Sequence, residues 1–215
     1  MLIAELWRYP VKSMAGEPLQ VADVRETGIV GDRVVQVINA AGGTVTSRTE
    51  PKLLGYHATL GADGEPLVDG KPWRDVDVRD AAGSDARLVR YEGVERFDVL
   101  PLLVATDGAI AAFGYDRRRL RPNIVISGVN GLDERRWEGK TLRASEVIIG
   151  IQDLRERCIM TTFDPDTLVQ DVDVLRKIRR EFGGSLALNC FVVRPGRLAV
   201  GDKVEFGLGM PLDNV

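Results

Sequence analysis

The sequence predicts a mostly β protein, a barrel or a sandwich with a few short helices. Apolar and polar residues alternate over many short segments, and turn-forming pairs such as Asp63-Gly64 and Gly201-Asp202 separate these segments. Closely spaced short strands are typical of closed or stacked sheets, whereas a doubly wound sheet needs a longer helix after most strands. We therefore expect a β-barrel with a few short helices attached to it.

Predicted strands run along the whole chain. Residues 2–9 alternate up to Pro10, and residues 34–38 and 44–48 flank a glycine-containing turn as a hairpin. The remaining candidate strands are residues 76–79, 87–91, 123–127, 146–151, 189–194 and 203–206. The polar residues 80–85 form the best boundary, which divides the chain into an N-terminal β region over residues 1–85, packed on a barrel over residues 86–215.

Two helices interrupt the strands. Thr106-Asp107 is expected to cap a short helix that ends at Phe113 and Gly114. A second helix begins at Asp171 or Asp173, and its apolar face is formed by Val172, Leu175, Ile178 and Phe182. Its other face carries arginine and lysine, either as a solvated face or as a docking surface for an acidic partner.

Charge and hydropathy exclude several classes of function. The 215 residues carry a formal net charge of -3, so the chain has no overall attraction for nucleic acid or for an anionic membrane. No apolar run approaches the roughly 20 residues of a membrane span, and the first residues lack the pattern of a targeting signal. We therefore predict a cytoplasmic protein that binds neither nucleic acid nor a membrane.

The two cysteines and the single histidine limit the metal sites that the chain can build by itself. Cys158 and Cys190 form no Cys-x-x-Cys motif, which excludes a zinc ribbon or an iron–sulfur cluster held by this chain alone. Cys190 lies in an apolar strand and is expected in the core. Cys158 follows Arg157, where a thiolate can act as a soft metal ligand or a nucleophile, or the thiol can pack as a small hydrophobe.

Three upstream clusters of cations and hydrogen-bond donors can converge on an anion. Lys12 and Ser13 follow a strand that ends at a proline, and a glycine-rich turn places Arg33 at the start of another strand. Arg121 and Asn123 are expected on the same face of a strand, because strand residues two apart share a face. Arginine is also the side chain best suited to bidentate contacts with phosphate.

Taken in order, these segments resemble the MOSC proteins, in the branch of the mitochondrial amidoxime-reducing component and its bacterial relatives. The segments are Tyr9-Pro10-Val11-Lys12-Ser13, Gly31-Asp32-Arg33, residues 121–127 and residues 157–167. The resemblance extends from about residue 2 to residue 206 and includes residues 46–51. It implies a MOSC β-barrel fold.

The resemblance also implies a molybdenum cofactor, whose metal is bound by a pterin dithiolene and by one protein cysteine. Cys158 matches the catalytic cysteine that ligates the metal in that family. The residues that match positions holding the pterin and its phosphate are Lys12, Ser13, Arg33, Arg121, Asn123 and Arg157. Thr161 and Thr162 follow in an expected strand, so at most one of them faces the cofactor.

The implied activity is that of a molybdoenzyme oxidoreductase, which reduces a small N-hydroxylated substrate such as an amidoxime or a hydroxylamine. Electrons are expected from a separate protein of iron–sulfur, flavin or cytochrome type, since the chain shows no motif for such a group. The alternative is a carrier of sulfur or of the cofactor, in which Cys158 holds a persulfide and works with a pyridoxal-phosphate-dependent sulfurase. The chain departs from the family in its shorter length and at Leu168, where the family often has glycine.

Overall fold

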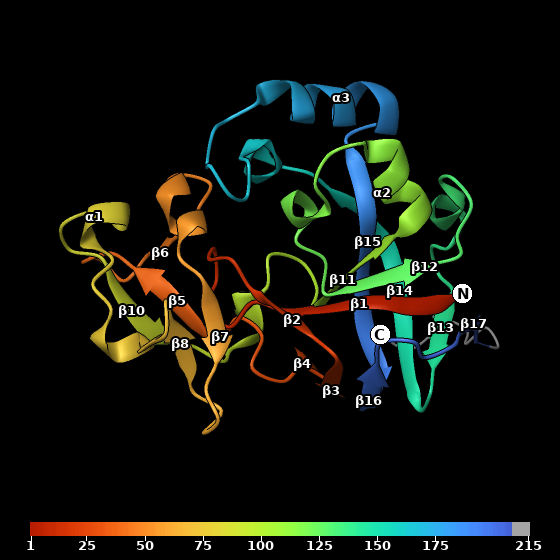
Figure 1. The fold of residues 1–215 in the computed structure, drawn as a ribbon, viewed down its shortest axis with the longest axis horizontal. Helices are drawn as coiled ribbons and strands as arrows, with labels where there is room; N and C mark the ends of the chain where they lie inside the picture. The colour runs from red at the N-terminus through yellow and green to blue at the C-terminus, as the bar shows by residue number, and fades with distance from the viewer. Residues whose placement is uncertain (208–215) are drawn as a thin grey trace.

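The computed structural model describes residues 1–207, apart from the side chain of Val94, and it confirms a predominantly β protein (Figure 1). The strands are β1 (Leu2–Arg8), β2 (Glu17–Leu19), β3 (Val21–Arg25), β4 (Gly28–Ile29), β5 (Val35–Ile38), β6 (Thr44–Val45), β7 (Ala58–Leu60), β8 (Pro66–Val68), β9 (Lys71–Pro72), β10 (Arg87–Arg90), β11 (Leu102–Thr106), β12 (Ile124–Ser127), β13 (Thr141–Ala144), β14 (Val147–Glu156), β15 (Ser185–Arg194), β16 (Gly196–Ala199) and β17 (Val204–Phe206). The α-helices are α1 (Arg79–Ala82), α2 (Asp107–Phe113) and α3 (Val172–Phe182). None of the helices in the described part of the chain has the length and hydropathy of a membrane span.

The largest sheet has eight strands in the order β17-β13-β14-β15-β11-β12-β1-β2. Neighbouring strands are antiparallel except β11 and β12, which run parallel and are joined through α2. The strand order of this sheet is open, from β17 at one end to β2 at the other. The expectation of a closed barrel is therefore corrected to a curled, open sheet. The start of β1 lies beside β17, because Ile3 N donates to Asp202 O and Val204 N to Met1 O, each at 2.9 Å. Closure stops there because the rest of β1 already pairs with β12 and β2.

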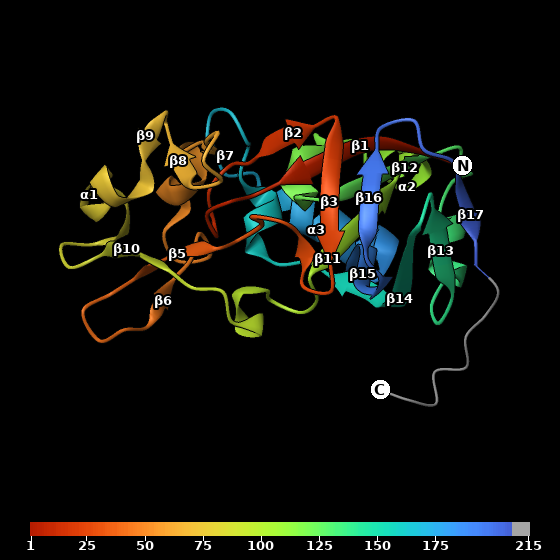
Figure 2. The same cartoon turned by 90° about the horizontal axis from the view of Figure 1, so that it is seen from below.

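Three small sheets complete the fold. The sheets β10-β5-β6 and β7-β8-β9 lie to the left of the large sheet in Figure 1 and share a separate apolar core. The sheet β16-β3-β4 crosses the lower face of the molecule, where Figure 2 shows β3 and β16 side by side. Strands β1 and β3 therefore pair with strands from the second half of the chain, β12 and β16, and the division at residue 85 stays a prediction.

Two predicted strands are wrong, and local side-chain bonds explain why. Residues 76–79 are an irregular segment leading into α1, where the Asp77 carboxylate accepts from Arg79 N at 3.0 Å and starts the helical turn. Thr161 and Thr162 lie in a one-turn 3-10 helix over residues 159–162. Their hydroxyls donate to the carbonyls of Cys158 (2.9 Å) and Ile159 (2.6 Å), so both threonines bond to this turn itself.

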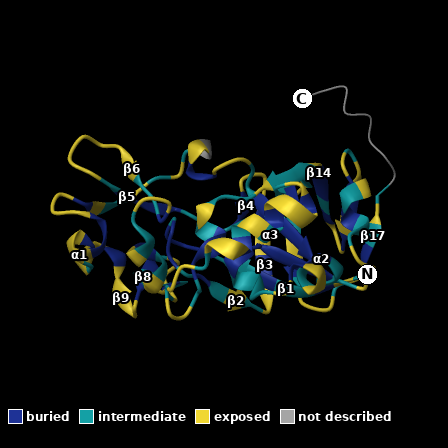
Figure 3. Ribbon diagram, turned by 90° about the horizontal axis from the view of Figure 1, so that it is seen from above, coloured by how far each residue is buried: buried dark blue, intermediate teal, exposed yellow. Residues whose placement is uncertain are grey.

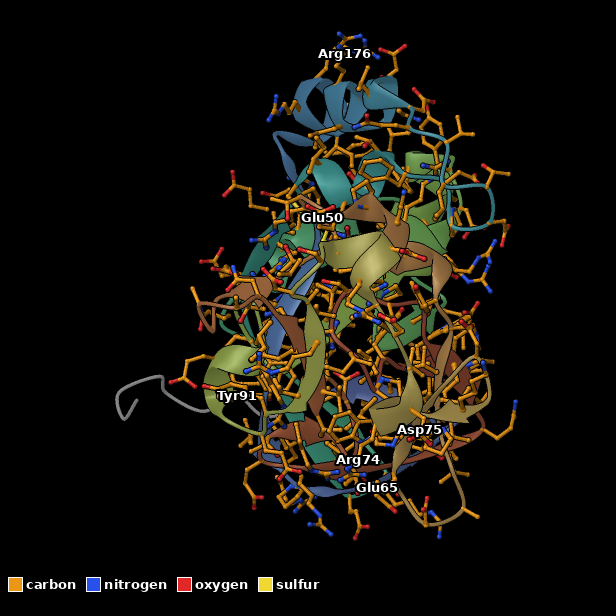
Figure 4. The ribbon with its side chains drawn as sticks, turned by 90° about the vertical axis from the view of Figure 1, so that its left-hand side faces the viewer. Glu50, Glu65, Arg74, Asp75, Tyr91 and Arg176 are labelled. Carbon is orange, nitrogen blue, oxygen red and sulfur yellow. The ribbon has the colours of Figure 1, made fainter. Side chains whose placement is uncertain are left out.

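Helix α3 begins and ends where the sequence predicts. The Asp171 carboxylate accepts from Asp173 N at 2.9 Å, and Gly183 ends the helix with φ 61°. The buried face is formed by Val174, Ile178 and Phe182, whereas Val172 is 45% exposed and does not belong to it. Figure 3 shows this outer, exposed side of the helix, and Figure 4 shows Arg176 pointing away from the body.

Candidate functional site

One pocket opens between the large sheet and the small sheets, and the seven residues that the sequence marks as a site all line it. They come from three stretches of the chain that are far apart: Lys12, Ser13 and Arg33; Arg121 and Asn123; Arg157 and Cys158. The structure therefore brings the predicted residues together. Their roles toward a cofactor stay predictions.

The end of β1 is fixed to the Gly31-Asp32-Arg33 turn by a buried carboxylate. Asp32 is fully buried, accepts from Tyr9 N at 2.7 Å and pairs with the Arg33 guanidinium. Two backbone bonds join the same segments, from Arg33 N to Tyr9 O (2.7 Å) and from Lys12 N to Val35 O (2.8 Å). The two loops thus form one rigid wall of the pocket.

Three of the predicted site residues have a left-handed backbone: Ser13 (φ 72°), Arg33 (φ 54°) and Arg121 (φ 55°). Such conformations cost about 1–3 kcal/mol for non-glycine residues and concentrate at functional sites. Arg121 ends the one-turn helix Arg117–Leu120, and β12 starts only at Ile124. The expectation that Arg121 and Asn123 share a strand face is therefore wrong, although both side chains reach the pocket.

The Asn123 carboxamide is held by the fold. Its side chain is 1% exposed, its Oδ1 accepts from Leu103 N at 3.1 Å, and its Nδ2 donates to Trp7 O at 3.3 Å. These bonds connect β1, β11 and the segment before β12 on the pocket floor. Asn123 thus contributes mainly to the shape of the wall.

Cys158 lies where β14 passes into the 3-10 helix, and its thiol is free and partly exposed. Its carbonyl accepts from Thr161 N (3.1 Å) and Thr161 Oγ1 (2.9 Å), which fixes the backbone at this point. Cys190 is fully buried in the core, as predicted, and burial raises the pKa of its thiol. A cysteine must be accessible to solvent in order to react, and of the two cysteines only Cys158 is.

Two guanidinium groups of the pocket have no carboxylate partner among residues 1–207. Arg121 donates to Met14 O (2.7 Å) and lies 4.3 Å from the Tyr9 ring centre, and Arg157 donates to Leu120 O at 2.8 Å. Burial lowers the pKa of each to about 10, which leaves both charged at neutral pH. The Nε of Arg157 is buried with no acceptor within the described chain. A partly buried cation without a carboxylate partner is costly, and a bound anion would compensate it.

Sequence reasoning missed five further charged residues of this pocket: Arg48, Asp98, Arg119, Arg155 and Glu156. The Asp98 carboxylate contacts Lys12 Nζ (3.0 Å), Arg48 Nη2 (2.8 Å) and Arg155 Nη2 (3.3 Å). Arg48 has a raised pKa: burial opposes the shift, but the neighbouring Asp98 and Cys158 outweigh it. The place of Arg155 in the pocket could have been predicted, because it stands two residues before Arg157 and strand residues two apart share a face. Asp98 lies in an irregular segment with no such pattern.

These features define a class: a mostly β protein with a pocket rich in cationic side chains and lined by a partly exposed thiol. No group of three or more histidine, cysteine or acidic side chains in residues 1–207 could hold a metal ion. The family model of the MOSC N-terminal beta barrel domain matches residues 1–99, and that of the MOSC domain matches residues 108–205. The chain belongs to the MOSC family.

Known relatives agree with this assignment. The chain is 26% identical to human mitochondrial amidoxime-reducing component 1 over 284 aligned positions, which cover 94% of this chain and 82% of the relative. Human mitochondrial amidoxime reducing component 2 is 27% identical, with 82% and 72% covered. The first alignment is longer than the 215 residues of this chain, so the chain lacks segments that the human protein has.

Among solved structures, the YUAD protein from Bacillus subtilis has a similar fold. The TM-score is 0.53 at 14% sequence identity, with 95% of this chain and 94% of that chain covered. Leu168, where the resemblance leads us to expect glycine, has a left-handed backbone with φ 60°. Glycine adopts such a conformation without the steric cost that a side chain brings.

Proposed function

We propose that the protein is a molybdenum-cofactor oxidoreductase that reduces N-hydroxylated compounds with electrons from a separate protein. The names of the human relatives support N-reduction, since both refer to amidoxime reduction. The observation that carries the proposal is the free, partly exposed Cys158 in a pocket where Arg121 and Arg157 have no carboxylate partner. The cytoplasmic location stays a prediction, because these relatives are named as mitochondrial.

The donor set of the pocket fits a pterin cofactor that carries a phosphate. Lys12, Arg33 and Arg121 offer cationic donors for the phosphate, and the partly buried Arg157, which has no carboxylate partner among residues 1–207, adds a further positive charge. Cys158 would ligate the metal, because a thiolate suits a metal already bound by sulfur. When bound, the cofactor supplies a redox-active molybdenum centre that can exchange an oxygen atom.

The protein residues hold the reacting centre and compensate its charge. Arg157 N donates to Gly184 O (3.0 Å) and the Thr161 bonds hold the Cys158 carbonyl, so the thiol is fixed at the pocket wall. The net reaction breaks the N–O bond, forms an N–H bond and releases water. It consumes two electrons from the partner protein and two protons. Two cysteines, one of them buried, cannot hold an iron–sulfur cluster, which supports a separate electron donor.

The metal content of matched cysteine variants tests this proposal. Protein from a cofactor-producing host is analysed for molybdenum and pterin as wild type, Cys158→Ala and Cys190→Ala. We expect about one molybdenum per chain in wild type and in Cys190→Ala, and loss of the metal in Cys158→Ala. Equal molybdenum in the wild type and Cys158→Ala would overturn the assignment of Cys158.

Turnover separates the enzyme from the sulfur carrier. Loaded wild-type protein should reduce benzamidoxime with an artificial reductant but not with a nicotinamide nucleotide alone. Failure with every N-hydroxylated compound tried would contradict the proposed reaction. A sulfur adduct on Cys158 without stoichiometric molybdenum, seen by mass spectrometry, would instead indicate the persulfide carrier.

A further inference from the structure

A second cavity lies on the other side of the wall formed by Arg119, Arg121 and Met160, which line both cavities. We propose that this second cavity binds a single-ring aromatic acid, with the ring between aromatic side chains and the acid group on Arg121. The inference goes beyond the proposed reaction and does not depend on a bound cofactor. It depends on the lining, the charge and the size of the cavity.

The lining is mostly apolar and rich in rings. Trp7, Tyr9 and Phe163 contribute aromatic faces or edges, and Pro18, Leu54 and Pro165 are further apolar lining residues. Two of these rings are held by polar bonds, from Trp7 Nε1 to Glu5 Oε2 (2.7 Å) and from Tyr9 Oη to Pro122 O (3.1 Å). Preformed aromatic walls favour a planar, apolar group, because ring pairs gain energy beyond the area that they bury.

The charge of the lining calls for an acidic occupant. Arg118 pairs with Asp116 (2.7 Å) and Asp166 (2.6 Å), and Arg119 pairs with Asp164 at 2.9 Å. Arg121 also lines the cavity and has no such partner among residues 1–207, while no aspartate or glutamate lines this cavity. In the cofactor-free chain one positive charge thus remains uncompensated beside the rings, and a carboxylate on the ligand would neutralise it.

Arg119 is already committed to bonds within the protein. It is 9% exposed, and two of its nitrogens donate to Thr162 O (3.0 Å) and to the Asp164 carboxylate. This side chain is therefore a fixed part of the wall between the two cavities, and the acid group of a ligand is left to Arg121.

The size limits the ligand to one ring. The cavity volume is about 120 Å³. An engineered apolar cavity of about 150 Å³ in another protein binds benzene, so the present cavity has room for one ring at most. The cavity is partly open to solvent, so the substituents of a para-nitrobenzoate ring can extend beyond it. The nitro group quenches tryptophan fluorescence, which makes this compound a suitable probe.

Titration of the cofactor-free 215-residue chain with para-nitrobenzoate tests the proposal. Calorimetry should give one site per chain, and the neutral analogue nitrobenzene should bind at least about tenfold more weakly because it lacks the carboxylate. Ala15→Leu places three more carbon atoms in the second cavity without changing the first pocket, and should weaken binding at least about tenfold. Ala111→Leu, at an exposed position of α2, is the matched control and should leave the affinity unchanged.

Fluorescence provides a readout that does not rely on the folding of Ala15→Leu. The probe should quench the emission of the wild-type protein, and Trp7→Phe should remove most of that quenching while leaving Trp73 and Trp137 in place. Equal affinity for nitrobenzene, unchanged affinity of Ala15→Leu, or full quenching in Trp7→Phe would each overturn the site. None of these results would bear on molybdenum binding by Cys158.

Discussion

Asp98→Asn removes the carboxylate that contacts three cations of the main pocket. The side chains of Lys12 and Arg155 are 13% and 17% exposed, whereas that of Arg48 is 45% exposed. Two partly buried pairs contribute about 1 kcal/mol each and the exposed pair only a few tenths, so we expect a loss of about 2 kcal/mol. For a chain of this size, such a loss lowers the melting temperature by about 4–8 °C.

Thermal unfolding at low ionic strength, with and without sulfate, measures this effect. Sulfate at about ten times its Kd stabilises a protein by about 1.4 kcal/mol, and it should stabilise Asp98→Asn more than the wild type because three cations are then free to bind it. Asp77→Asn is the matched control, since Asp77 pairs only with the exposed Arg79 outside the pocket. A wild-type melting temperature for Asp98→Asn, without additional stabilisation by sulfate, would refute this account of the pocket.

The pH dependence of the same variant follows from the sign of the pKa shift. Burial acts to raise the pKa of Asp98, but Lys12, Arg48 and Arg155 outweigh it and lower the pKa. The folded state therefore binds its proton more weakly than the unfolded state, whose pKa is about 4. The stabilisation is present above about pH 4 and is lost as the pH falls through the folded-state pKa, so wild type and Asp98→Asn should converge in acid.

Three other predictions concern the pocket and helix α3. Sulfate affinity should fall as the pH rises through about 10, because burial lowers the pKa of Arg121 and of Arg157 to about 10 and their positive charge is lost there. Constant affinity from neutral pH to about pH 11 would contradict this. Ile178→Ala should lower the unfolding free energy by about 3 kcal/mol in denaturant titrations, whereas Val172→Ala, at an exposed position, should cost under about 0.5 kcal/mol. Asp171→Ala should lower the unfolding free energy by about 1 kcal/mol in the same titrations, since it removes the cap of helix α3. A loss equal to that of Ile178→Ala would argue that Asp171 does more than cap the helix.

Local patterns predicted the elements whose causes lie within a few residues. Helix α3 begins at its Asp171 cap and ends at Gly183 as the sequence indicates, because caps act over three or four residues. The strand expected at residues 76–79 failed because one side chain, that of Asp77, bonds the backbone two residues later. Val172 fits the apolar spacing, but at the first turn it has no neighbouring element to cover it, so it stays exposed.

The sequence alone determined the class of the fold, the family resemblance and seven of the residues that meet in the main pocket. These depend on residue types and spacings that are visible along the chain. Only the tertiary structure decided that the large sheet is open, that Asp98 joins Lys12, Arg48 and Arg155, and that Arg121 and Arg157 lack carboxylate partners. Charge compensation depends on distances between segments far apart in sequence, and those distances exist only once the chain has folded.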